Sequence, residues 1–190
     1  MSNDMRKRVE RFRNKAKDIK WPENIVDFES SNFCVSGIKP LDEAIDEIQS
    51  AFVWCWSMKD HLKKSLYENN KNISRKEFNK CFENEINSYK ELTLCADIAN
   101  SEKHQGLDQK PRSGSVVTLD MSHLIKISKS TISQIHRIDG RYFFTPKSNE
   151  AVKLTANIIN DKNEIVADAF NCIDKSLEAW ELITSKYSGT

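Results

Sequence analysis

The segment Ala51-Phe52-Val53-Trp54-Cys55-Trp56-Ser57-Met58 decides how this chain folds, because seven of its eight residues are apolar. On both sides of it, from residue 41 to about 69, apolar residues recur every three or four positions, which predicts one long amphipathic helix. An apolar girdle at the centre of such a helix indicates that other helices surround it. The asparagine-rich stretch 69–72 then predicts a turn.

A second long helix is predicted from about residue 75 to His104. Ser74 and Glu77 have the spacing of a capping box, in which the serine oxygen accepts a backbone N–H and the glutamate reaches back. Two long helices joined by a short polar turn lie antiparallel. A third amphipathic segment, at about 167–186, is predicted to close the bundle. The residues expected in its core are Phe52, Cys55, Leu62, Phe82, Leu92, Ala96, Leu177 and Trp180.

Beyond a polar loop at 108–114, the apolar period changes to two residues, which is typical of strands. Asp139-Gly140 predicts a tight hairpin, and the polar turn at 160–163 predicts a second one. Residues 23–40 mix Pro, Ser, Asn and Gly with isolated apolar residues, so we expect an irregular connector there. The predicted fold class is mainly α: an antiparallel helical bundle with a small β-rich insertion at about 115–166, before the C-terminal helix.

The predicted organisation has two parts, a basic N-terminal helix with its connector at 1–40 and the bundle at 41–190. From Arg6 to Lys20 there are eight basic residues against two acidic ones. One interpretation is a nucleic-acid-binding arm that contacts phosphates; the other is a solvated terminal helix. The residues of the arm that we expect to bind nucleic acid are Arg6, Arg8, Arg11, Arg13 and Lys17.

Composition excludes several classes of protein. Charged residues make up 30% of the chain and hydrophobic ones 38%, and no stretch approaches 18 consecutive apolar residues. The five cysteines form no C-x-x-C pair, so neither a disulfide framework nor a metal site is indicated. No nucleotide-binding or other cofactor motif is present. The sequence therefore predicts a soluble cytoplasmic protein without a cofactor, a metal or a membrane partner.

One polar cluster could carry chemistry. Asp97, Asn100 and His104 share a helix face, and Asp60 lies one turn beyond Trp56 on the neighbouring helix. A carboxylate can orient an imidazole, while an amide and the Lys103 ammonium can hold a phosphate. Alternatively, an ion pair between Asp60 and Lys103 would only fix the packing of the two helices. Both interpretations remain open.

The stretches Met58-Lys59-Asp60-His61-Leu62 and 94–104 (LCADIANSEKH) resemble the patterns hLkDwl and icrDlaNxxKH of the HEPN-like superfamily. The resemblance covers roughly residues 41–107 and 150–186. It implies a helical bundle that dimerises. Active branches of the superfamily are metal-independent ribonucleases of toxin–antitoxin and phage-defence systems. The resemblance implies one of three kinds of partner: RNA, a second copy of the chain, or an antitoxin or defence protein.

The ribonuclease branches carry an arginine four to six residues before a histidine, and no arginine precedes His104 at that spacing. Lys103 is a point charge and lacks the two-pronged grip of arginine on phosphate. We therefore predict a non-catalytic dimerisation, interaction or sensing module associated with RNA. The alternative is a metal-independent endoribonuclease, with His104 as general acid or base, Lys103 and Asn100 on the phosphate and Asp60 orienting the imidazole.

Overall fold

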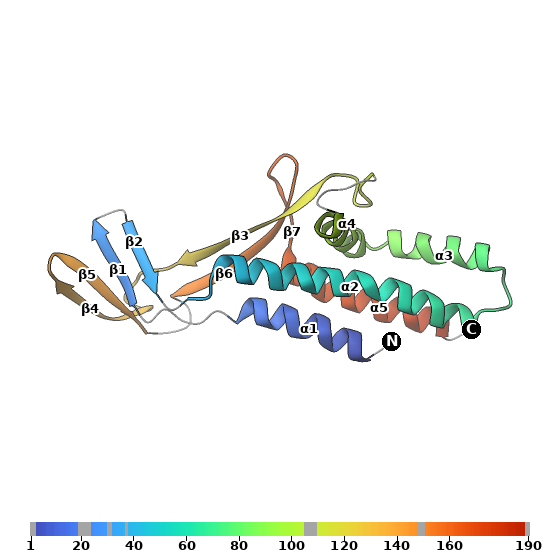
Figure 1. Cartoon of the computed structure of the whole chain (residues 1–190), viewed down its shortest axis with the longest axis horizontal. Helices are drawn as coiled ribbons and strands as arrows, with labels where there is room; N and C mark the ends of the chain where they lie inside the picture. Colours follow the sequence, from blue (N-terminus) through green and yellow to red (C-terminus); the bar gives the residue numbers. More distant parts are fainter. Residues whose placement is uncertain are drawn as a thin grey trace. The chain divides into compact units, whose positions relative to one another are not determined.

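The computed structural model describes residues 3–18, 24–29, 32–36, 38–104, 110–147 and 151–188. These residues form five helices and seven strands (Figure 1). The helices are α1 (Asn3–Lys17), α2 (Leu41–Asn69), α3 (Arg75–Asn87), α4 (Lys90–His104) and α5 (Ala169–Ser188). The strands are β1 (Asn24–Glu29), β2 (Asn32–Ser36), β3 (Val117–Ile125), β4 (Ile132–Ile138), β5 (Arg141–Pro146), β6 (Val152–Asn160) and β7 (Ile165–Asp168).

The predicted fold class is wrong, because the chain is a mixed α/β protein and not a helical bundle with a small insertion. Its strands build two sheets, a four-stranded one in the order β2-β1-β5-β4 and a three-stranded one in the order β3-β6-β7. The four-stranded sheet takes strands from both sides of α2 in the sequence. The two sheets are therefore a major part of the fold, although more residues lie in helices than in strands.

The chain divides into two compact units. We call residues 1–14, 46–120 and 156–190 the helical unit, and residues 15–45 and 121–155 the sheet unit. Both units draw on segments from distant parts of the sequence.

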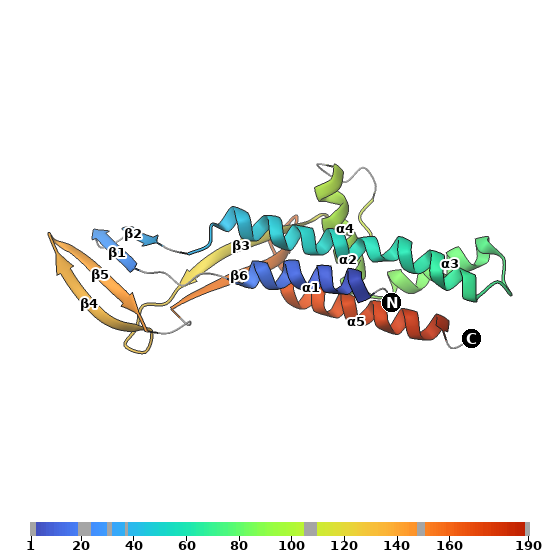
Figure 2. The same cartoon turned by 60° about the horizontal axis from the view of Figure 1, so that its bottom comes forward.

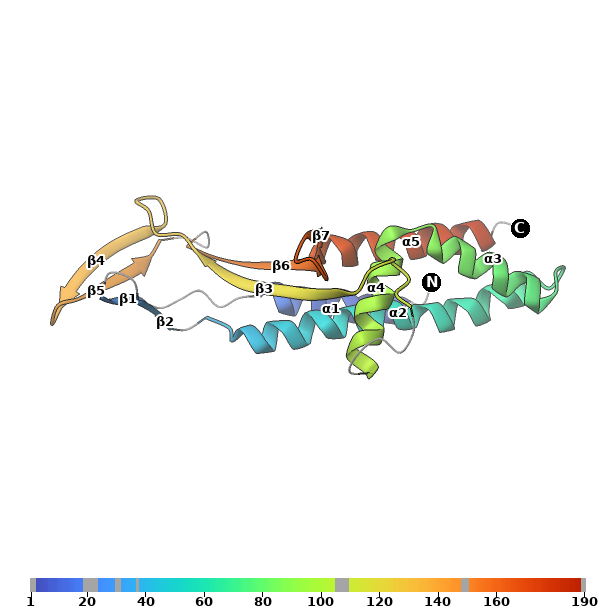
Figure 3. The same cartoon turned by 90° about the horizontal axis from the view of Figure 1, so that it is seen from above.

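The core of the helical unit is built around α2, whose predicted span is confirmed. Trp180 of α5 is fully buried, and its indole Nε1 donates a hydrogen bond to the Cys55 carbonyl of α2 at 3.1 Å. Figure 3 shows α4 crossing α2. The eight residues predicted to form the core are all buried: Phe52, Cys55, Leu62, Phe82, Leu92, Ala96, Leu177 and Trp180.

The single helix predicted from 75 to 104 is two helices, α3 and α4, with a break at Ser88. The Ser88 hydroxyl donates to the Glu85 carbonyl at 2.7 Å, so the side chain replaces the next helical hydrogen bond. The break redirects the chain, and α4 can then cross α2. At the other end of α3 the predicted cap is confirmed, with the Glu77 N–H donating to Ser74 Oγ at 3.2 Å.

Helix α1 packs against the helical unit with its first turns. Met5 and Val9 are buried, and Arg6 and Arg13 form ion pairs with Glu181 and Asp174 of α5. Figure 2 shows α1 running alongside α5. The basic N-terminal segment is therefore a docked helix with one apolar face, and not a fully solvated one.

In the sheet unit, the connector that we expected to be irregular contains β1 and β2. Strand β1 pairs antiparallel with β2 and with β5, where Ile25 lies opposite Phe144. The predicted hairpin between β4 and β5 is confirmed, because Asp139 and Gly140 take φ angles of 50° and 80°. The second predicted hairpin is confirmed as well, since β6 and β7 pair antiparallel on either side of residues 161–164.

Candidate functional site

Of the four predicted catalytic residues, Asp60 and Asn100 are among the residues whose side chains the structure describes. Asn100 is half-buried in the last turns of α4, whereas Asp60 is exposed on α2. Within the part of the chain that the structure describes, no hydrogen bond or ion pair joins Asp60 to α4. The side chains of Lys103 and His104 lie outside the described residues, so an arrangement of Lys103 and His104 around Asp60 stays a prediction.

Asp97, on the predicted polar face of α4, has a structural role. Its carboxylate is buried, and its two oxygens accept the backbone N–H groups of Arg112 and Ser113, each at 2.8 Å. Two charge-assisted hydrogen bonds fix residues 112 and 113 of the segment that leads to β3. Asp97 thereby fixes the position of the Arg112 backbone, from which the guanidinium group extends.

Three cations from two separate segments converge on Glu83 of α3. Its carboxylate oxygens lie 3.5 Å from Lys59 Nζ, 3.4 Å from Lys63 Nζ and 3.0 Å from an Arg112 guanidinium nitrogen. Three positive charges against one negative charge leave an excess of +2 at this point. We call Lys59, Lys63, Glu83 and Arg112 the cationic cluster.

Trp56 holds two of these cations in place. The Lys59 ammonium lies 4.9 Å and the Arg112 guanidinium 5.0 Å from the centroid of the indole ring. Trp56 itself is buried, so its ring presents a fixed surface to both groups. Arg112 also donates to the Asn87 side-chain oxygen at 3.0 Å. Trp56 and Asn87 therefore give Lys59 and Arg112 defined contacts in addition to their ion pairs with Glu83.

The electrostatics of the cluster favour the charged state of Glu83. Partial burial by itself raises the pKa of this carboxyl, but Lys59, Arg112 and Lys63 together outweigh it and lower the pKa below its ordinary value. At neutral pH Glu83 is ionised, and it neutralises only one of the three cations around it.

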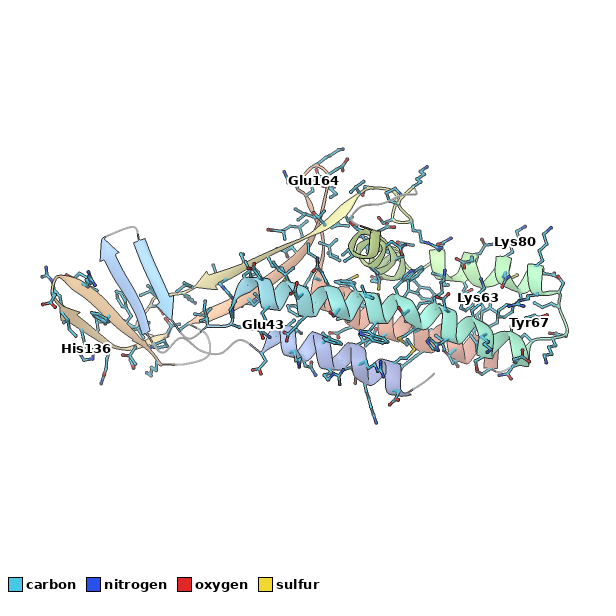
Figure 4. The ribbon with its side chains drawn as sticks, in the orientation of Figure 1. Glu43, Lys63, Tyr67, Lys80, His136 and Glu164 are labelled. Carbon is cyan, nitrogen blue, oxygen red and sulfur yellow. The ribbon has the colours of Figure 1, made fainter. Side chains whose placement is uncertain are left out.

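A polar depression of about 410 Å³ adjoins the cluster and shares Lys63 with it. The guanidinium of Arg75 lies 5.8 Å from the ring centroid of Tyr67 in this depression. Figure 4 shows Lys63 and Tyr67 on the α2 side that faces α3. The lining residues are Asp60, Lys63, Lys64, Tyr67, Glu68, Arg75 and Asn79. Asp60, a predicted site residue, thus lies among basic residues of α2 and α3.

The predicted nucleic-acid-binding residues of α1 contact the chain itself. Arg6 pairs with Glu10 and Glu181, and Arg13 pairs with Asp174. The Arg8 guanidinium lies 4.6 Å from the Trp54 ring centroid, and that of Arg11 lies 5.3 Å from the Phe12 centroid. Lys17 is exposed and has an interaction partner of its own. These contacts explain how α1 is held and leave its predicted role with nucleic acid as a hypothesis.

None of the four residues of the cationic cluster was singled out from the sequence as a site residue. The i,i+4 spacing of Lys59 and Lys63 on α2 was a readable signal that both lie on one helix face. Arg112 gave no such signal, since it lies 29 residues from Glu83 in a loop.

No protein-family model, no curated protein and no solved structure matches this chain. Among the residues that the structure describes, no group of His, Cys, Asp and Glu could hold a metal ion. In the same residues, no helix combines the length and the apolar character needed to cross a membrane. The cationic cluster itself places three cations beside one carboxylate and an aromatic ring, an arrangement that suits a phosphate or another anion.

Proposed function

We propose that the chain is a non-catalytic interaction module that binds RNA through its phosphate backbone, with Lys59, Lys63 and Arg112 as the contacting residues. The observation that carries the proposal is the excess of +2 in the cationic cluster, where three cations surround one carboxylate. A phosphate would complete the neutralisation that Glu83 begins. The adjoining depression adds Lys64 and Arg75, together with the carboxylates Asp60 and Glu68, so that basic residues are in a small excess there.

Preorganisation supports this proposal. Glu83, Trp56 and Asn87 already restrict the long side chains of the cluster, so that little side-chain entropy remains to be lost on binding. Each phosphate that replaces a condensed counterion adds salt-dependent affinity. The resemblance to the HEPN-like superfamily supports RNA as the ligand. It also supports a second copy of this chain, or an antitoxin or defence protein, as a protein partner.

Variants with opposite expected effects test the proposal. Lys63→Gln and Arg112→Gln should each weaken RNA binding, roughly threefold to tenfold at 0.1 M salt, and should lower the slope of log K against log salt by about 0.7–0.9. Glu83→Gln should strengthen binding several-fold, because it removes the carboxylate that competes with phosphate. The measurement is fluorescence anisotropy with labelled 20-nucleotide RNA, both single-stranded and duplex, at several salt concentrations.

Lys80→Gln is the matched control, since it removes one positive charge from α3 on the side away from α2 (Figure 4). It should leave affinity and salt slope nearly unchanged. Thermal melts of each variant check that the fold is intact. If Glu83→Gln binds no better than the parent, or if Lys80→Gln weakens binding as much as Lys63→Gln, the cluster is not the phosphate site and the proposal fails.

The same samples separate a binding module from a ribonuclease. After incubation with excess protein in the presence of a chelator, the RNA should run intact on a denaturing gel at pH 5 to 9. Cleavage that disappears in His104→Ala would overturn the non-catalytic proposal. It would assign the predicted acid–base role to His104, because one positioned group commonly contributes about 10²–10⁴-fold in rate.

A further inference from the structure

The hairpin of β4 and β5 exposes large apolar side chains that a folded sheet normally covers. Ile135 is 60% exposed, Ile138 55% and Tyr142 41%. Strand β4 lies at the edge of the four-stranded sheet, and in it only Ile132 is buried. Apolar side chains gathered on one hairpin are a signature of a binding surface.

The two faces of the hairpin differ in chemistry. Ile135 lies opposite Phe144 and Arg137 opposite Tyr142, so these four side chains share one face. We call them the aromatic face. The rings of Tyr142 and Phe144 are 6.5 Å apart, and the Arg137 guanidinium lies 5.4 Å from the Tyr142 centroid. The opposite face carries His136, Ile138, Arg141 and Phe143.

The hairpin that carries the aromatic face is mainly basic. Between residues 126 and 147 there are five basic residues and one acidic residue, Asp139, while Asp27 of β1 pairs with Tyr142 on the other side of β5. The basic residues and exposed rings of the hairpin fit an anion with flat apolar groups. A single-stranded nucleic acid has both, because its phosphates are charged and its bases have free π-faces.

We propose that the aromatic face binds single-stranded RNA, with bases stacked on Tyr142 and Phe144 and Arg137 beside a phosphate or a base. The choice of RNA rests on the function proposed above. A duplex does not fit, because its bases are already stacked on one another. A lipid surface fits poorly, because Asp139 at the tip of the hairpin would have to enter it.

The test uses the full chain with labelled oligouridine of ten nucleotides and with duplex RNA of equal length. Tyr142→Ala should weaken single-strand binding roughly tenfold or more, since stacking contributes about 1–3 kcal/mol per base. Tyr142→Phe keeps the ring and should keep the affinity. Duplex binding should be unchanged in both variants.

Two matched pairs compare the faces. Arg137→Gln and Ile135→Ala lie on the aromatic face, and Arg141→Gln and Ile138→Ala make the same changes on the opposite face. Arg137→Gln should weaken single-strand binding at least threefold more than Arg141→Gln does. Equal losses would show that only the net charge of the hairpin matters, and would overturn the inference.

The remaining outcomes are distinct. If Lys63→Gln weakens binding of both RNAs while Tyr142→Ala has no effect, the proposed function stands and this inference fails. If Tyr142→Ala weakens single-strand binding while Lys63→Gln has no effect, this inference stands and the phosphate site on α2 and α3 fails. Binding to phosphatidylserine vesicles that is lost in Tyr142→Ala, without binding to oligouridine, would identify a lipid surface and overturn the inference.

Discussion

At the scale of a single residue, Asp97 lies on the helix face that was predicted to be catalytic, but its role in the structure is to anchor a loop. Its spacing with Asn100 and His104 suggested chemistry, but its two oxygens accept the N–H groups of Arg112 and Ser113. The buried carboxylate holds residues 112 and 113 of the segment that leads to β3. Through this loop it also positions the guanidinium of the cationic cluster.

Replacing Asp97 with asparagine should therefore destabilise the protein. The amide NH₂ group would face a backbone N–H that has lost its acceptor, and a buried unsatisfied donor costs about 1–3 kcal/mol. Urea unfolding followed by circular dichroism measures the change. The exposed Asp120→Asn should change the free energy of unfolding by no more than about 0.5 kcal/mol. Equal effects in the two variants would contradict the anchoring role of Asp97.

At the scale of elements, α5 closes the core of the helical unit against α2. Trp180 packs its ring near Trp56 and Phe82, with ring centroids 6.4 Å and 6.5 Å away, and it donates to a carbonyl of α2. An indole with its N–H satisfied can be buried completely without a polar cost. The same helix provides the two carboxylates that hold α1, Asp174 and Glu181.

Trp180→Ala should cost about 3–5 kcal/mol in the free energy of unfolding, the usual loss when a large aromatic side chain is removed from a core. Leu182→Ala is the control, because Leu182 is 59% exposed on the same helix. Its cost should stay within about 0.5 kcal/mol. Denaturant melts of both variants decide the matter, and a loss below about 1 kcal/mol for Trp180→Ala would show that α5 does not close the core.

At the scale of the whole molecule, three thiols report on how tightly the helical unit is closed. Cys55, Cys95 and Cys172 come from three different helices and are all buried. Burial raises the pKa of Cys95 well above its ordinary value, and that of Cys172 to about 12. Cys81 is exposed.

A thiol reagent should therefore distinguish these cysteines in the native protein. At pH 8 a thiol with a pKa near 12 is ionised in only about one molecule in ten thousand, and only the thiolate reacts. With DTNB, Cys81 should react within seconds to minutes, while the three buried thiols should react only as fast as the protein unfolds. Cys34→Ser is the background for this measurement, because the Cys34 side chain lies outside the described residues. Rapid reaction of all four thiols would show that the core opens locally.

The sequence by itself determined those features that depend on near neighbours. The span of α2, the cap at Ser74 and the turn at Asp139 follow from helix period, side-chain capping and backbone preference, all of which act over a few residues. The core residues were predictable for the same reason, since periodicity identifies the apolar face of each helix. These preferences act between residues that are close in the sequence, so they do not depend on the tertiary fold.

Only the tertiary structure decided which distant segments meet. The pairing of β1 with β5 joins Ile25 to Phe144, and the contact of Glu83 with Arg112 depends on the path taken after α4. The local sequence does not specify the partner in such contacts. An edge strand can pair with any strand, and a buried carboxylate can accept a hydrogen bond from any donor, so the packing of the whole chain determines which partner is near. The candidate site belongs to this second class: its lysines lie one helical turn apart, but its arginine and its carboxylate come together only when the chain has folded.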